Sequence, residues 1–380
     1  MQVGDSIYLD YQASTPIDER VLQTIYAASS TLFANPHAAD HALGWRAADA
    51  IESAAKKVAN LFELQGDDVI FTSCASEANA MVVRTAEAMA LRSSRTDILI
   101  GAADHSSIQK EAERGSLSLR HIPLDERGAP DPYQLKAIIN DATALVSVIG
   151  VNNENGAIAD LETISNICES SNVPLHVDLA QAPVALDVDL LELNIAFATI
   201  SAHKLYGPKG VGALLAAPGM YQHIEPVIFG AGQQNGLRGG TLPTELIIGF
   251  GEACQIVMDT GTEERITIAK IRNHFVKTLE EKQIAHLVGT LENRHPGNAL
   301  MQFPGQDASD LLARLQPQIA ASTQSACASG SIEPSHVLRA MGYDRQFASE
   351  CIRFSFGRFS NHAQANKAIS SLIAALSKQA

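Results

Sequence analysis

Long apolar runs are missing from this sequence of 380 residues. The longest, such as 144–151, have the length of a buried strand, whereas a membrane-spanning helix needs roughly 18 apolar residues or more. The first residues also lack the basic stretch and apolar core of a signal peptide. We therefore expect a cytoplasmic protein that does not contact a membrane.

Basic residues are scarce as well. Lysine and arginine number 28 against 42 aspartates and glutamates, which gives a formal net charge of −14, and no lysine- or arginine-rich run occurs. Because binding to nucleic-acid phosphates needs a basic surface, direct nucleic-acid binding is excluded. An acidic surface keeps a protein soluble, and it would also suit a basic protein partner.

Cysteines are few, and no pair has the Cys-x-x-Cys spacing. An odd number of scattered cysteines fits reduced cytosolic thiols and argues against a zinc site, any other metal site or a disulfide framework. Four of them stand in apolar or helical contexts and are expected to be small core residues. Cys327 stands apart in a segment of small residues. The five are Cys74, Cys168, Cys254, Cys327 and Cys351.

What the sequence does contain is an alternation of strand-like and helical patterns. Apolar residues make up 46% and charged residues 18%, which is typical of a globular protein. Between 67 and 216 the alternation predicts an α/β fold with a mainly parallel sheet that helices cover on both faces. The strands are expected at 68–72, 97–101, 119–123, 144–149, 173–178, 197–201 and 211–215.

The chain is long enough for two domains. A helical pattern from 242 to 279 is expected to break near Thr260 and Gly261, and we place the domain boundary there. Earlier helices are expected after Pro16 and from about 45 to 62, and later strands near 299–303, 319–322 and 352–356, followed by a final helix. The predicted organisation is an extended arm over 1–15, a large domain over 16–260 and a smaller C-terminal α/β domain over 261–380.

A polar turn follows the buried strand that ends near 200. It reads Ser201-Ala-His-Lys-Leu-Tyr-Gly-Pro-Lys-Gly210 and places Lys204 in the crevice beyond the strand ends, where open α/β sheets bind ligands. An isolated loop lysine is usually solvated. Upstream, however, another expected strand ends on Asp178. An aspartate that keeps a pyridine nitrogen protonated and a lysine that forms a Schiff base with an aldehyde are the pair that pyridoxal phosphate requires.

Two further strand ends carry candidate groups. Ser76 stands at a helix start after the strand 68–72, where exposed N–H groups and a hydroxyl would bind a phosphate. Taken alone, such a serine is usually only a helix cap. His105 follows the strand 97–101 and could shuttle protons, whereas the alternative is a capping or loop histidine.

With these motifs in place, the chain resembles the NifS/IscS-type cysteine desulfurases of the class V aminotransferase group. The resemblance extends nearly from end to end, from Tyr8-Leu-Asp10 to Ile352-Arg-Phe-Ser-Phe-Gly-Arg358. It implies the pyridoxal-phosphate fold type I, with a large sheet domain and a smaller C-terminal domain. It also implies roles for residues that the patterns alone leave open.

The resemblance implies a set of cofactor-binding residues. Gln181 matches a residue that binds the phenolic oxygen of the cofactor, and Ser201 and His203 match phosphate ligands. Thr241, after a glycine-rich segment, matches a residue that reaches the phosphate in the neighbouring subunit, which implies a homodimer. The implied set is Ala75, Ser76, His105, Asn153, Asp178, Gln181, Ser201, His203, Lys204 and Thr241.

The resemblance also implies residues for substrate binding and catalysis. Arg353 matches an arginine that forks onto the substrate α-carboxylate, and Asn153 and Asn35 match residues near the substrate. Cys327, in the Ser-x-Ala-Cys pattern, matches the nucleophile, and its segment is expected to be mobile and exposed. Two departures from the family pattern are Cys74 in place of glycine and Asn155 in place of an aliphatic residue.

The implied function is a cysteine desulfurase that uses pyridoxal phosphate. Lys204, His105 and Cys327 would be its catalytic residues, converting L-cysteine to L-alanine and passing the sulfur, as a persulfide on Cys327, to an acceptor protein. Iron–sulfur assembly, tRNA thiolation and DNA phosphorothioation all begin with this chemistry. The alternatives are a selenocysteine or cysteine-sulfinate lyase, a class V transaminase, and a catalytically idle scaffold that binds a partner.

Overall fold

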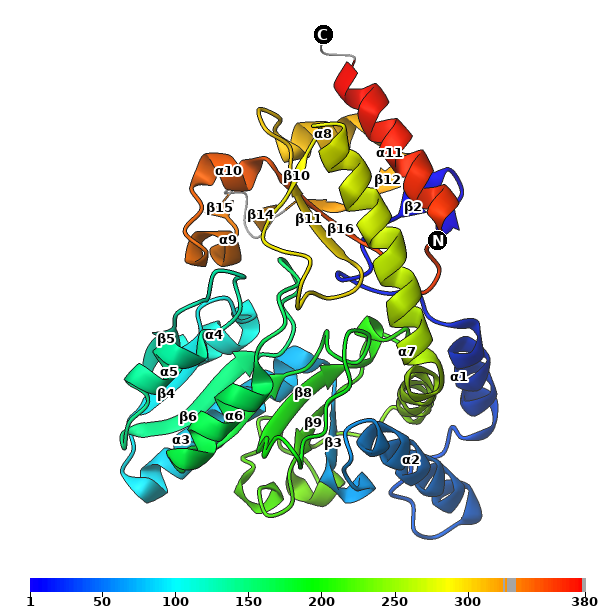
Figure 1. The fold of residues 1–380 in the computed structure, drawn as a ribbon. Helices are drawn as coiled ribbons and strands as arrows, with labels where there is room; N and C mark the ends of the chain where they lie inside the picture. Colours follow the sequence, from blue (N-terminus) through cyan, green and yellow to red (C-terminus); the bar gives the residue numbers. More distant parts are fainter. Residues whose placement is uncertain (324, 327–332, 378–380) are drawn as a thin grey trace.

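The computed structural model describes residues 1–323, 325–326 and 333–377, so Cys327 lies outside the described residues. Figure 1 shows two lobes, a larger one built on a broad sheet and a smaller one above it, with the long helix α7 running through both. Within the described part of the chain, no helix combines the length and apolarity needed to cross a bilayer.

The large lobe is built on a seven-stranded sheet in the order β3-β9-β8-β7-β6-β4-β5. Neighbouring strands run parallel except around β9, which is antiparallel to both β3 and β8. The predicted mainly parallel α/β sheet is therefore confirmed. Its strands are β3 Val69–Thr72, β4 Asp97–Gly101, β5 Ser118–Ile122, β6 Thr143–Ile149, β7 Leu175–Asp178, β8 Phe197–Ser201 and β9 Gly212–Ala216.

Helices cover both faces of this sheet because successive strand residues point to opposite sides. In β4, Ile98 and Ile100 pack on the face covered by α3, whereas Leu99 packs into the core on the other face. Burial on both faces explains why the central strands are almost wholly apolar. The helices of the large lobe are α1 Glu19–Thr31, α2 Ala42–Asn60, α3 Ala75–Ser93, α4 Ser106–Arg114, α5 Pro132–Ile138 and α6 Leu161–Ser170.

The helix α7, Thr244–Glu281, is continuous, so the predicted break near Thr260 and Gly261 is wrong. A mid-helix glycine costs only about 1 kcal/mol relative to alanine. Packing outweighs that cost here, since the half up to Val257 contributes to the core of the large sheet and the half from Ile268 onward to the second core. The proposed domain limits at 15/16 and 260/261 remain a prediction.

The small lobe is built on a four-stranded antiparallel sheet in the order β10-β11-β16-β13. A second sheet, β1-β2-β12, joins the N-terminal segment to it, and Ile7 and Leu9 of that segment are fully buried in the same core as Phe275 and Phe354. The N-terminal arm is thus packed into the C-terminal half.

The remaining elements lie mostly in this lobe. Its strands are β1 Gln2–Val3, β2 Ser6–Tyr8, β10 His286–Leu287, β11 Asn298–Gln302, β12 Ile319–Ala320, β13 Ser322–Thr323, β14 Ser325–Ala326, β15 Glu333–Pro334 and β16 Cys351–Ser355. Its helices are α8 Ala308–Arg314, α9 His336–Ala340, α10 Arg345–Ser349 and α11 His362–Ser377. Short 3-10 turns occupy Gly66–Asp68, Ala202–Lys204, Tyr221–His223 and Gln233–Gly236.

Phe275 offers a test of the second core. Its ring lies 5.1 Å from that of Phe354 and 5.2 Å from that of Phe356, all three side chains being buried. Phe275→Ala should lower the free energy of unfolding by about 3–5 kcal/mol, because it removes a large buried side chain and leaves a cavity. Urea unfolding measures this loss. The exposed Tyr133→Ala serves as control and should change it by less than about 0.5 kcal/mol. An equal effect of both variants would contradict the assignment.

Candidate active site

A cavity of about 240 Å³ opens at the carboxyl ends of the central strands of the large sheet. Parallel strands bring their carboxyl ends to one edge, so residues far apart in the sequence meet there. Nine of the ten residues expected to bind the cofactor lie around this cavity, Thr241 being the exception. The lining residues are Cys74, Ala75, Ser76, His105, Ile149, Asn153, Asp178, Ala180, Gln181, Ser201, His203 and Lys204.

Lys204 stands in the 3-10 turn that follows β8. Its ammonium group donates to the backbone carbonyl of Gln12 at 2.7 Å and to that of Ala13 at 2.8 Å. Burial, and then the positive charge of Arg353, lower the pKa of Lys204 to about 8, against the opposing effect of Asp10 and Asp178. The side chain can therefore become a neutral amine close to physiological pH.

Asp178 ends β7 and is buried against the cavity. It accepts hydrogen bonds from the backbone N–H of Ala180 at 3.0 Å and from Asn79 Nδ2 at 3.1 Å. Asn79 Nδ2 also donates to Ser107 Oγ at 2.9 Å. These contacts hold the carboxylate in place at the cavity wall.

His105 caps α4 and lines the cavity at the same time, so its two alternative roles coexist. Its Nδ1 accepts from the backbone N–H of Ser107 at 3.2 Å and lies 2.8 Å from Ser107 Oγ. In the neutral ring the proton then resides on Nε2, since Nδ1 is an acceptor. Burial lowers the pKa of His105 below its ordinary value, which favours this neutral ring.

Sequence reasoning missed Asn79 and Ser107, which connect His105 to Asp178. Asn79 lies one helical turn after Ser76 in α3, and Ser107 lies two residues after His105. Helical spacing from Ser76 could have pointed to Asn79, because residues three apart lie on the same face.

The start of α3 forms a cradle suited to an anion. The helix begins after Cys74 without a side-chain cap, which leaves its first N–H groups for a ligand. The residues Ser76, Ser201 and His203 line the cavity there. Burial, and then Lys204 and Lys209, lower the pKa of His203 to about 4, so its ring is neutral at physiological pH.

Cys74 lines the cavity, so its predicted place in the core is wrong. The other described cysteines, Cys168, Cys254 and Cys351, are buried as expected. Cys74 is the N-cap of α3 and has φ −174° and ψ 171°, an extended conformation that any residue adopts. The glycine of the family pattern is therefore not needed for this turn.

Four residues singled out in the sequence do not line the cavity. Asn35 is exposed and accepts from the backbone N–H of His37 at 3.0 Å, and Thr241 is exposed just before α7. Arg353 lies on β16 beside the cavity, where its Nη1 donates to the carbonyl of Asn153 at 2.7 Å. Asn155 is buried away from the cavity, and its Nδ2 donates to the carbonyl of Gly128 at 3.1 Å.

The sequence profile of the aminotransferase class-V family matches residues 7–367. The chain belongs to this family. It is 36% identical over 370 residues to a mitochondrial cysteine desulfurase of Arabidopsis thaliana, covering 96% of this chain and 81% of that protein. It is 35% identical over 376 residues to the cysteine desulfurase IscS of Rickettsia bellii, covering 98% of this chain and 91% of that protein.

The fold of this class-V family member also matches a solved structure. It superposes on a NifS-like protein with a TM-score of 0.91 at 29% identity, over 98% of this chain and 99% of that one. The resemblance to the NifS/IscS-type cysteine desulfurases and the expected fold type are therefore confirmed.

The lowered pKa of Lys204 predicts its labelling by cyanate, which carbamoylates only neutral amines. In the cofactor-free protein the labelled fraction of Lys204 should rise with pH around a midpoint near 8, because the group is protonated below its pKa. Arg353→Gln should move the midpoint upward, since it removes a positive charge that disfavours the ammonium form. Peptide mass spectrometry after timed labelling measures the midpoint.

The urea-unfolded protein provides the control for this measurement. There Lys204 should titrate near the ordinary value of about 10.4. A midpoint near that value in the folded protein, or a downward shift in Arg353→Gln, would contradict the account of the site.

Proposed function

We propose that this protein is a cysteine desulfurase that uses pyridoxal phosphate. It converts L-cysteine to L-alanine and passes the sulfur, as a persulfide on Cys327, to an acceptor protein. The observation that carries the proposal is the cavity in which a buried lysine of lowered pKa, Lys204, meets the carboxylate of Asp178. Membership in the family of the cysteine desulfurases supports it.

The residues around the cavity fit the chemical groups of pyridoxal phosphate. Lys204 offers an amine for the aldehyde, and Asp178 offers a carboxylate for the ring nitrogen. The uncapped start of α3 with Ser76 and Ser201 suits a phosphate. When bound, the cofactor supplies a ring that takes up the electrons released when a bond at the substrate α-carbon breaks.

Each protein group has a task in this reaction. The neutral amine of Lys204 can remove the proton from the substrate α-carbon, which its lowered pKa favours. Asp178, held by Asn79 and the N–H of Ala180, provides the negative charge that keeps a proton on the ring nitrogen. Arg353 provides a planar guanidinium for the substrate carboxylate.

Sulfur transfer is assigned to Cys327, which lies outside the described residues. Its thiolate attacks the sulfur of L-cysteine and forms an S–S bond, while the substrate C–S bond breaks and its electron pair stays with carbon. Protonation at that carbon, and return of a proton from Lys204 to the α-carbon, then give alanine. We assign the first proton to the Nε2–H of His105, whose ring lines the cavity. The persulfide on Cys327 is then available to an acceptor.

We define the acceptor protein only by its role, which is to receive the sulfur from the persulfide on Cys327. Iron–sulfur assembly, tRNA thiolation and DNA phosphorothioation all start from such a persulfide. The net charge of −14 favours contact with a basic protein and disfavours direct contact with nucleic acid. The free thiols Cys74, Cys168, Cys254 and Cys351 fit a reducing compartment such as the cytoplasm.

A homodimer is also part of the proposal, with Thr241 contributing to the phosphate site of the partner subunit. Large apolar side chains are exposed in α1, just after α1, in α2 and between the 3-10 turns at 221–223 and 233–236. Figure 1 shows α1 and α2 on the same side of the large lobe. Tyr26 is 77% exposed, Phe33 74%, Trp45 55% and Phe229 80%, and apolar surface of this kind is typical of a subunit interface.

The test is the intact mass of the loaded protein after L-cysteine, together with the alanine released. The wild type should gain sulfur and release alanine, whereas Cys327→Ala should lose both because the accepting thiol is gone. Lys204→Ala should slow alanine release by about 10²–10⁴-fold, since it removes the general base. Cys74→Ala is the matched control, because it removes a cavity thiol and should keep both readouts.

Two outcomes would contradict this proposal in different ways. Undiminished alanine release from Cys327→Ala would favour the lyase alternatives, which need no protein thiol, whereas a transaminase would release no alanine from L-cysteine in either protein. If Cys74→Ala gains no sulfur while Cys327→Ala still does, the nucleophile is Cys74, the cysteine that lines the cavity.

A further inference from the structure

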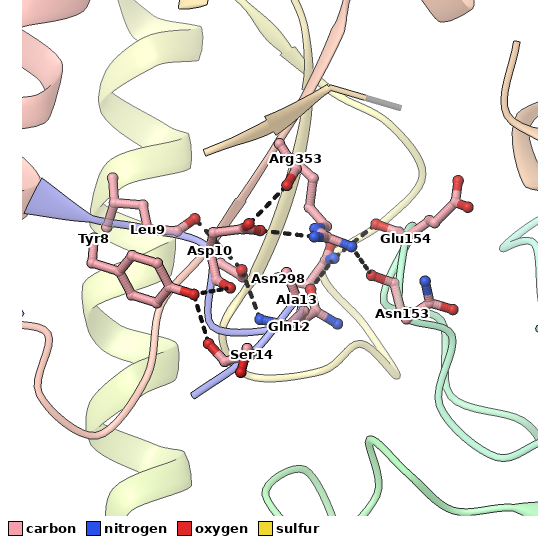
Figure 2. Close-up of polar contacts among 12 residues, drawn as sticks. Tyr8, Leu9, Asp10, Gln12, Ala13, Ser14, Asn153, Glu154, Asn298 and Arg353 are labelled. Atoms are coloured by element: carbon pink, nitrogen blue, oxygen red, sulfur yellow. Dashed lines mark hydrogen bonds and ion pairs between the residues drawn. The ribbon is translucent and has the colours of Figure 1, made fainter. Parts of the chain in front are cut away.

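Arg353 is held by two contacts that fix the plane of its guanidinium, as Figure 2 shows. Its Nη2 donates to Asp10 Oδ1 at 2.8 Å, and its Nη1 donates to the carbonyl of Asn153 at 2.7 Å. The Nε–H, by contrast, is buried and finds no hydrogen-bond partner among the residues that the structure describes. The described part of the chain therefore leaves one edge of the guanidinium without an acceptor.

Asp10 is itself firmly anchored. Its Oδ2 accepts from Ser322 Oγ at 2.8 Å, and its backbone forms a parallel bridge to Ser355 of β16. The hydroxyl of Tyr8 donates to the carbonyl of Asp10 at 3.0 Å and to that of Ser14 at 2.7 Å. The carboxylate thus stands at a fixed point beside β16.

The same N-terminal segment also holds Lys204, two and three residues after Asp10. The carbonyls of Gln12 and Ala13 accept from its ammonium group. Arg353 lowers the pKa of Lys204 and Asp10 raises it, so the two cations and the carboxylate share one electrostatic environment. Asp10 offsets the repulsion between two neighbouring positive groups in the free protein.

We propose that Asp10 is a positioning residue for carboxylate recognition, which tethers Arg353 so that its Nε edge is presented to the α-carboxylate of an amino acid. The proposal rests on the proposed function for the identity of the ligand. An unpartnered buried donor is costly, and a carboxylate that accepts from it recovers that cost. A guanidinium bound by both Nη atoms cannot turn this edge away, so less entropy is lost when the carboxylate binds.

A purely structural ion pair would look different, and the chain contains one for comparison. Arg358 pairs with Asp18 at 2.7 Å, its Nε is taken by Glu264 at 2.8 Å, and it lies over the ring of Tyr206 at 4.1 Å from the centroid. The arginine side chains of the two pairs are equally buried, at 7% and 8% exposed. Arg358 also has one buried nitrogen without a partner, its Nη2, but its Nε edge is occupied by Glu264, whereas in Arg353 both Nη atoms are occupied and the Nε edge has no partner among the described residues.

The experiment compares the binding of L-alanine and L-alaninamide to the protein loaded with pyridoxal phosphate, by titration calorimetry. These probes differ at the carboxylate, which also alters the basicity of the amine. The change in the ratio of their dissociation constants between wild type and variant, at one pH, therefore reports recognition of the carboxylate. Asp10→Ala should reduce this preference by about tenfold or more, because a charge-assisted contact that orients the arginine is lost. Asp10→Asn should keep most of it, since the amide oxygen still accepts from Nη2.

Asp18→Ala is the matched control. It breaks a comparable buried pair, so it should lower the unfolding temperature without changing the alanine to alaninamide preference. If Asp10→Ala does not fold, Asp10→Ser, whose shorter side chain cannot span the same distance, carries the same expectation.

A wild-type preference in Asp10→Ala or Asp10→Ser, or an equal loss of preference in Asp18→Ala, would overturn the proposal. Binding of L-alanine needs no turnover. Failure of the desulfurase proposal would therefore appear in a different measurement, as no release of alanine from L-cysteine. A protein that prefers L-alanine through Asp10 but releases no alanine would keep this inference and reject that function.

Discussion

A buried ammonium group must be surrounded by oxygen atoms, and in this protein that requirement fixes the N-terminal segment. Lys204 is satisfied by the backbone carbonyls of Gln12 and Ala13. Gln12 in turn accepts from Gln181 Nε2 at its carbonyl, at 2.9 Å, and from Asn298 Nδ2 at its Oε1, at 2.6 Å. A short stretch of chain thus connects the large sheet, the cavity and the small sheet.

This connection decides how the two lobes share the site. Lys204 and Asp178 come from the carboxyl edge of the large sheet, whereas Arg353 comes from β16 of the small one. The segment before Asp10 pairs with β12, and α7 contributes to both cores. The distance between the lysine and the arginine is therefore set by several elements at once, which favours a fixed arrangement over a hinged one.

The sequence predicts much of this because polar residues at the ends of parallel strands must meet at one edge. That rule predicts a common cavity for Lys204, Asp178 and His105. It could not reveal the carbonyls of Gln12 and Ala13, since backbone groups have no signature in the sequence. The sequence also did not predict that α7 is continuous, because tertiary packing overrides the low helix propensity of Gly261. Nor did it predict that Cys74 lines the cavity, because tertiary packing decides whether a small side chain is buried or exposed.

The central claim is that Lys204 is the residue that holds the cofactor. Its most direct test is borohydride reduction of the protein isolated with pyridoxal phosphate, followed by peptide mapping, because reduction fixes a carbonyl compound on the amine that binds it. The account predicts that the fixed group is found on the peptide that contains Lys204 and on no other lysine. A group fixed on a different lysine, or none fixed at all, would contradict it.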